Sequence, residues 1–192
     1  AVELGKQLVG KFPKSKYNSE AYRILGENSY FQQNWNDAIE YLKLYSNNQT
    51  QVQRADMYML GIANYMIADY PNAITYLGKV TTEGDSLAQN AYIFIGHANL
   101  QQHQADKARM AFQNASLIDA DGRLKEESLY NYALATYESK APFGETIKAF
   151  DRFINEYPNS THLNSIYELM VNAFLTDKNY LGAVEAIDNI KN

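Results

Sequence analysis

Residues 22–45 read YRILGENSYFQQNWNDAIEYLKLY, in which Tyr22, Leu25 and Gly26 are followed by Trp35, Ala38 and Leu42 at fixed distances. The same spacing begins again at Met57 and at Tyr92, so the pattern has a period of about 35 residues. A period of this length is typical of a helical repeat protein, in which each repeat is one supersecondary unit.

Two further copies appear when the chain is aligned on the glycine position of the first three. Leu134 and Val171 stand at that position, and an alanine or threonine follows twelve residues later. The alignment predicts an end of an upstream repeat and five repeats, over residues 1–17, 18–52, 53–88, 89–123, 124–160 and 161–192. We expect all of them to form a single domain over residues 1–192.

The spacing has a physical interpretation. The small residue on the first helix and the alanine twelve residues later let two antiparallel helices cross closely. A bulkier residue further along the second helix then fills the space between successive hairpins: Leu42, Leu77, Phe112, Phe150 and Ile187. A generic helical bundle has no reason to repeat these spacings, so the sequence predicts an all-α solenoid of antiparallel helix hairpins.

The pattern closely resembles the tetratricopeptide repeat, which has an aromatic-x-x-Leu-Gly start, a central alanine, then a phenylalanine and a proline. The fourth copy keeps the closing proline, as Pro158. The resemblance implies a right-handed superhelix and a non-catalytic scaffold that binds a protein or peptide on its concave face. Some relatives hold a terminal carboxylate with a basic clamp, but only Arg23 stands at such a place here, so that clamp is not expected.

The first residues match the end of the fourth copy, with Phe12-Pro13 aligned to Tyr157-Pro158. We therefore expect an orphan second helix at the start, and a chain that is a fragment of a longer repeat protein. These junctions are also similar to those of tetratricopeptide proteins of the bacterial envelope. The resemblance favours the periplasm or outer membrane, with the cytoplasm as the alternative.

Composition excludes several classes of protein. The chain has 192 residues, a net charge of −5 and no cysteine, which excludes disulfides and thiol chemistry. No basic stripe is present, which argues against nucleic acid as a partner. No apolar run approaches the ~18 residues of a membrane span.

A search for catalytic chemistry finds none. The three histidines (His97, His103 and His162) lack the spacing of a zinc site. Asp119-x-Asp121-Gly122 is similar to part of a calcium loop, but Leu117 and Ser128 occupy its end positions, so a polar turn is the better interpretation. We expect no enzyme activity, no cofactor and no metal.

The first helices of successive hairpins should line the concave face. From the register, the candidate partner-binding residues of the first three copies are Arg23, Glu27, Tyr30, Phe31, Tyr58, Ile62, Tyr65, Met66, Ile93, His97 and Leu100. Tyrosine and methionine at helical spacing also occur in cores, so each of these side chains either lines the face or packs between hairpins.

Two functions remain open. The first is a scaffold that binds a protein or peptide segment, anchored by the groove aromatics. The alternative is a structural spacer or self-association module within a larger envelope assembly, since the apolar residues Ile187 and Ile190 leave the last helix without a polar cap.

Overall fold

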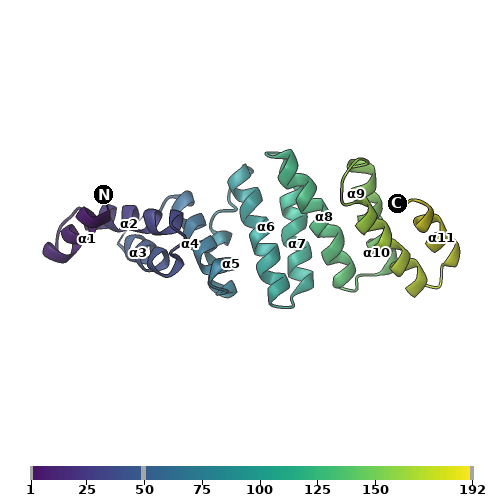
Figure 1. Cartoon of the computed structure of the whole chain (residues 1–192), viewed down its shortest axis with the longest axis horizontal. Coiled ribbons are helices and arrows are strands. Elements are labelled where there is room, and N and C mark those ends of the chain that lie inside the picture. Colours follow the sequence, from purple (N-terminus) through teal and green to yellow (C-terminus); the bar gives the residue numbers. More distant parts are fainter. Residues whose placement is uncertain (1, 49–50, 191–192) are drawn as a thin grey trace. The chain divides into compact units, whose positions relative to one another are not determined.

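The computed structural model describes residues 2–48 and 51–190, and over these residues the chain forms eleven α-helices and no strand (Figure 1). The all-α prediction is confirmed. The chain divides into two compact units, Ala1–Glu83 and Gly84–Asn192. A single domain over residues 1–192 stays a prediction, and the units are described separately.

The first unit, unit 1, contains five helices that pack in chain order, α1 on α2, α2 on α3, α3 on α4 and α4 on α5. Helices α2 and α4, the first helices of their hairpins, also touch each other. The helices of unit 1 are α1 (Val2–Lys11), α2 (Asn18–Phe31), α3 (Trp35–Asn47), α4 (Arg54–Met66) and α5 (Tyr70–Gly78). Since contacts join only neighbours and next neighbours, the arrangement is that of a stack of hairpins.

The second unit, unit 2, repeats this order of contacts, and α8 touches both α6 and α10. In Figure 1 the helices α6, α7 and α8 lie side by side, as their contacts require. The helices of unit 2 are α6 (Ser86–Gln101), α7 (Ala105–Leu117), α8 (Gly122–Glu138), α9 (Phe143–Glu156), α10 (Leu163–Thr176) and α11 (Tyr180–Asp188).

The expected crossings are built as the spacing predicts. A Cβ atom added to Gly26 would lie 2.6 Å from Leu42 Cγ, and one added to Gly61 would lie 2.6 Å from Leu77 Cγ. At Gly96 the nearest atom is Phe112 Cε1, at 2.5 Å. Real side-chain contacts do not come this close, so glycine is what lets the two helices of these hairpins approach.

The filling residues are buried in four of the five repeats. Leu42, Leu77, Phe112 and Phe150 have at most 1% of their surface exposed, whereas Ile187 on α11 is 51% exposed. For Ile187 the prediction was wrong, because no helix within the described residues packs over this face of α11.

Each hairpin turn uses a residue with positive φ that is not glycine. These residues are Gln33, Ala68, His103, Lys140 and Lys178. The residue that follows donates its backbone N–H to the carbonyl five positions back, for example Asp69 to Asn64 at 2.9 Å and Ala141 to Thr136 at 3.4 Å. This is the 6→1 bond that closes many helices.

The turn geometry corrects the register of the fourth repeat. Thr136 is the counterpart of Asn64, which places Ala133, and not Leu134, at the glycine position. Ala133 is fully buried, as a small residue at a helix crossing must be. The turn before Phe143 has one extra residue, so that Leu134, and not Ala133, has the usual spacing to Phe143 in the sequence.

The start of α2 has the same hydrogen bonds as the start of α10. Ser15 N–H bonds to Phe12 O as Ser160 N–H bonds to Tyr157 O, and Tyr17 and His162 N–H bond to the preceding serine hydroxyls. Helix α1 therefore leads into α2 through the same junction that joins α9 to α10, and that α1 is the second helix of a hairpin stays a prediction.

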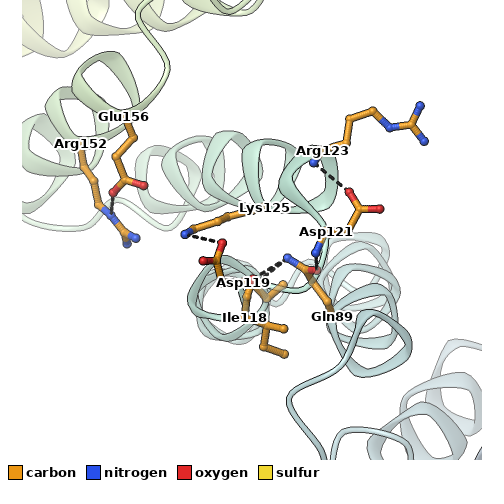
Figure 2. Close-up of polar contacts among 9 residues, drawn as sticks. Gln89, Ile118, Asp119, Asp121, Arg123, Lys125, Arg152 and Glu156 are labelled. Carbon is orange, nitrogen blue, oxygen red and sulfur yellow. Dashed lines mark hydrogen bonds and ion pairs between the residues drawn. The ribbon is translucent and has the colours of Figure 1, made fainter.

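In both units a polar side chain near the start of a hairpin's first helix forms hydrogen bonds with the backbone at the end of the same hairpin. In unit 1, Arg54 donates two hydrogen bonds to Val80 O, at 3.2 and 2.7 Å. In unit 2, Gln89 donates to Ala115 O at 3.3 Å and Ile118 O at 2.7 Å, and accepts from Asp121 N at 3.0 Å (Figure 2).

The cores lie between helices within each unit. In unit 1 a cluster of Ala38, Ile39, Leu42, Leu60 and Ala63 is flanked by Tyr30 and Trp35.

Among the described residues, no helix is both long and apolar enough to span a membrane.

Candidate functional site

The candidate residues of unit 1 lie on the facing helices α2 and α4, and they differ in exposure. Phe31 and Met66 are 76% and 51% exposed at the ends of the two helices. Tyr30, Tyr58 and Tyr65 are half-buried. Exposed apolar side chains next to half-buried aromatic ones are the composition of a binding surface.

Two of these tyrosines are held by their own hairpin turns. The Tyr30 ring packs edge-on against Trp35 with centroids 5.6 Å apart, and Tyr65 packs against Tyr70 at the same distance. Phe31 also contacts Tyr30, at 5.6 Å. The turn aromatics therefore fix the tyrosine rings in place and leave Phe31 as the projecting side chain.

Burial also affects the hydroxyl groups of these tyrosines. It raises the pKa of Tyr58 to about 12, with a smaller contribution from Tyr30, and it raises the pKa of Tyr30 and Tyr65 as well. The three phenols are therefore neutral at physiological pH and add no charge to this surface.

Ile62 and Ile93 lie in the cores. They are only 5% and 4% exposed, on α4 and α6. Their side chains are excluded from the surface that we propose below.

Arg23 is the centre of an ion-pair network on α2. Its Nε and Nη2 atoms donate to the two carboxylate oxygens of Glu20, at 3.1 and 2.6 Å, and its Nη1 atom donates to Glu27. The hydrogen bond from Arg23 lowers the pKa of Glu20. Arg23 is therefore fully engaged with acidic partners and does not stand ready to hold a carboxylate, as the sequence indicates.

The sequence analysis missed Asp56, which faces this network from α4. The side chain is 2% exposed, lies near the Tyr45 hydroxyl of α3, and has no hydrogen-bond partner for Oδ2. Burial raises the pKa of the Asp56 carboxyl, and the positive charge of Arg23 opposes that rise. The signal in the sequence is a charged residue at a repeat position where the other copies have uncharged ones.

In unit 2 the candidate residues on α6 have a different character. His97 is half-buried and packs edge-on against Phe112 with centroids 5.1 Å apart, and Leu100 is half-buried. Burial lowers the pKa of His97, and the charge of Glu127 partly opposes this. His97 is thus largely neutral at physiological pH.

A surface cavity of about 540 Å³ lies at the fourth hairpin turn, which the sequence analysis did not single out. Its walls come from the ends of α8 and α10 and the start of α9, and they include Tyr137, Lys140, Phe143 and Asp177. The extra residue of this turn, next to Pro142, was the available signal.

The acidic residues at the start of α8 form the polar turn that the sequence indicates. Asp121 Oδ1 accepts from the N–H groups of Arg123 and Leu124, at 2.8 and 3.1 Å, and Asp119 pairs with Lys125 at 3.0 Å (Figure 2). No group of three or more histidine and acidic side chains within residues 2–48 and 51–190 is placed to hold a metal ion.

Comparison with known proteins gives one family match. Residues 127–160 match the family model described as "Tetratricopeptide repeat". No curated protein matches the chain.

Solved structures of tetratricopeptide-type proteins match over most of the chain. YrrB, described as a tetratricopeptide repeat protein with an unusual peptide-binding site, has a TM-score of 0.71 and 12% identity, covering 98% of this chain and 91% of its own. MamA has a TM-score of 0.68 and 20% identity, covering 91% and 90%. A tetratricopeptide repeat protein from Parabacteroides merdae has a TM-score of 0.61 and 15% identity, covering 99% and 71%.

At these identities the structural matches establish the fold, and the family model identifies one repeat directly. The two findings together support the tetratricopeptide repeat family, to which the fourth repeat (residues 127–160) is matched, and they show that the chain has the fold of tetratricopeptide repeat proteins.

Proposed function

We propose that the chain is a non-catalytic scaffold that binds a protein or peptide segment along the first helices of its hairpins. The observation that carries the proposal is the apolar surface of unit 1, where Phe31 and Met66 project beside Tyr30, Tyr58 and Tyr65. Aromatic and methionine side chains of this kind are enriched in interfaces. YrrB, which has the same fold, is described as having a peptide-binding site.

In this proposal the binding residues of unit 1 are Arg23, Glu27, Tyr30, Phe31, Tyr58, Tyr65 and Met66. His97 and Leu100 extend the same role to unit 2. The partner is a protein or peptide, as the fold favours, and neither a cofactor nor a metal is needed.

The proposal is tested by replacing only side chains that the fold does not need. Phe31→Ser and Met66→Ser together should abolish capture of partners from a native lysate, with circular dichroism confirming the helical content. Tyr30 and Tyr65 are poorer choices, because they pack on Trp35 and Tyr70 and their loss would also disturb folding.

The matched control replaces two other exposed apolar side chains, Met110 and Leu117 on α7, which are 62% and 67% exposed. If the Met110→Ser and Leu117→Ser variant loses the same partners, capture reflects general stickiness and the proposal fails.

A second candidate function, self-association, is favoured by the uncovered face of α11. Tyr180, Leu181, Val184 and Ile187 are each more than half exposed. The counterpart of Ile187 in the preceding repeat is Phe150, which is completely buried under neighbouring helices. A chain that stays monomeric in sedimentation velocity at high concentration would exclude this function.

The compartment is also a proposal. We favour the bacterial envelope, on the similarity of the Phe12-Pro13 and Tyr157-Pro158 junctions to those of envelope proteins. Cell fractionation with an antibody against the chain tests it, and recovery from the cytoplasm alone would contradict it.

A further inference from the structure

One buried position of the repeat holds an acidic residue in the second repeat and an uncharged residue in the other four. Asp56 lies on α4 five residues before Gly61, and its counterparts in the other four repeats, at the corrected register, are Ala21, Ala91, Ser128 and Ile166. All five side chains are buried, but only Asp56 can carry a charge. A buried carboxylate is costly unless it is paired, so its presence at a core position requires a compensating function.

The pairing of Asp56 is incomplete. The Tyr45 hydroxyl lies near the carboxyl group, and the carboxylate oxygen Oδ2 is buried without a hydrogen-bond partner. Arg23 is close enough for the two charges to act on each other's pKa, yet its guanidinium donates to Glu20 and Glu27 instead.

The charges around Arg23 therefore do not balance. Three carboxylates, those of Glu20, Glu27 and Asp56, surround a single guanidinium, and the nearby Tyr45 is neutral. We call these three residues the carboxylate cluster. Because Arg23 neutralises only part of their charge, the three carboxylates keep an excess of negative charge. Glu20 remains accessible, with 57% of its side chain exposed.

On α2 the apolar surface follows this cluster by one helical turn, because Tyr30 and Phe31 lie three and four residues after Glu27. A cation beside tyrosine rings gains additional electrostatic attraction from the ring faces.

We propose that unit 1 binds a basic peptide segment: a lysine or arginine side chain of the partner pairs with the carboxylate cluster, and a neighbouring apolar side chain packs on Phe31 and Met66. This inference rests on the proposed function and names the chemistry of its partner. An organic cation fits better than a metal ion, because the described side chains form no metal-binding group. The incoming cation pairs first with Glu20, the most accessible of the three carboxylates.

The test uses the whole chain as bait for short random peptides displayed on phage. Selected sequences should carry lysine or arginine close to an aromatic or aliphatic residue. The chosen peptides are then synthesised, and their dissociation constants are measured with wild-type chain and with a Glu20→Gln, Glu27→Gln, Asp56→Asn variant.

We expect the triple variant to bind these peptides about tenfold more weakly or worse, since each lost charge pair lowers affinity. The matched control is Glu40→Gln, Asp106→Asn, Glu185→Gln, which removes the same number of negative charges from exposed positions. It should bind as the wild type does, which separates the cluster from the effect of net charge.

Three other results would overturn the inference. The basic partner is refuted if the selected peptides are acidic or uncharged, or if the triple variant binds them as tightly as the wild type does. The scaffold function is still supported in either case if the Phe31→Ser, Met66→Ser variant no longer binds the peptides. Peptides that bind all variants equally refute both proposals. A folded chain that selects no peptide at all counts against both.

Discussion

Unit 1 and unit 2 are built from the same hairpin, yet one buried position is uncharged in every repeat of unit 2 and in the first repeat of unit 1, where it is Ala21, and is acidic in the second repeat. In unit 2 the position holds Ala91, Ser128 and Ile166, which fit a closed core. In unit 1 the second repeat places Asp56 there, between an ion-pair network and a tyrosine hydroxyl. The backbone geometry is shared, so the difference lies in the chemistry of the side chains.

This comparison separates residues that hold the fold from residues that serve another purpose. Both units keep the glycine crossings, the turn residues with positive φ and the polar side chain that fastens each hairpin end, Arg54 or Gln89. Among the residues that the structure describes, Asp56 of unit 1 is the one acidic side chain that is buried. We infer that unit 1 keeps this carboxylate for a purpose other than folding.

The largest loss of stability is expected when a buried charge is introduced into unit 2. Ile166→Asp would bury a carboxylate among Leu129, Phe150 and Phe153 with no arginine beside it. We expect unit 2 to lose more than about 4 kcal/mol of unfolding free energy, because an unpaired buried charge is among the most damaging changes.

Urea denaturation followed by circular dichroism measures that loss. Ile166→Val, expected to cost about 1 kcal/mol, is the control for the change of volume. An Ile166→Asp chain as stable as the valine variant would mean that the position tolerates charge in both units, and Asp56 would then need no functional explanation.

The crossings shared by both units should be the next most sensitive feature. Gly96→Ala would place a methyl group 2.5 Å from the Phe112 ring in a packed interface. We expect a loss of about 1–3 kcal/mol despite the better helix propensity of alanine. Gly144→Ala on α9, where nothing lies within 4 Å, should leave the stability unchanged or slightly raised. Equal effects at both sites would contradict the close crossing.

Replacing the charge of unit 1 should have the opposite sign. Because burial raises the pKa of Asp56 in the fold, the folded state favours the protonated form, and stability is lost as pH rises through that pKa. Asp56→Asn should therefore make the chain more stable at pH 7. The advantage should vanish as the pH falls toward 4, with Arg23, Glu20, Glu27 and Tyr45 left in place.

Thermal unfolding at several pH values measures this difference. A variant that is more stable and yet binds basic peptides less well would show the exchange of stability for function that the comparison implies. A less stable Asp56→Asn variant would instead identify Asp56 as a structural residue.

Much of the fold could be predicted from the sequence because the repeat presents each physical requirement several times. Gly26, Gly61 and Gly96 fixed the crossings, and the alanines twelve residues later marked the second helices. The glycine position of the fourth repeat was predicted wrongly, at Leu134 instead of Ala133. The turn before Phe143 has one extra residue, which keeps the spacing from Leu134 to Phe143 the same as in the other repeats.

The candidate surface was only partly predictable. The register identified Phe31 and Met66, whose exposure depends on their position at the helix ends. It also included Ile62 and Ile93, because helical periodicity does not show which of two adjacent faces a neighbouring hairpin covers. Asp56 was missed because its position is a core one, and only the packing reveals a carboxyl oxygen without a partner.

The smallest expected effect concerns the position just after the glycine, which holds Glu27 in the first repeat, Ile62 in the second and His97 in the third. Burial lowers the pKa of His97, with Glu127 opposing, so the folded state favours the neutral imidazole. Its contribution to stability is present above the ordinary pKa of about 6.5 and is lost as pH falls below it. We expect the wild-type chain to lose slightly more unfolding free energy between pH 8 and pH 5 than a His97→Gln variant does. Urea denaturation at the two pH values measures both losses, and His103→Gln, at an exposed turn, is the control. If wild type and His97→Gln depended on pH in the same way, His97 would be solvated in solution and available on unit 2 as a polar contact for a partner.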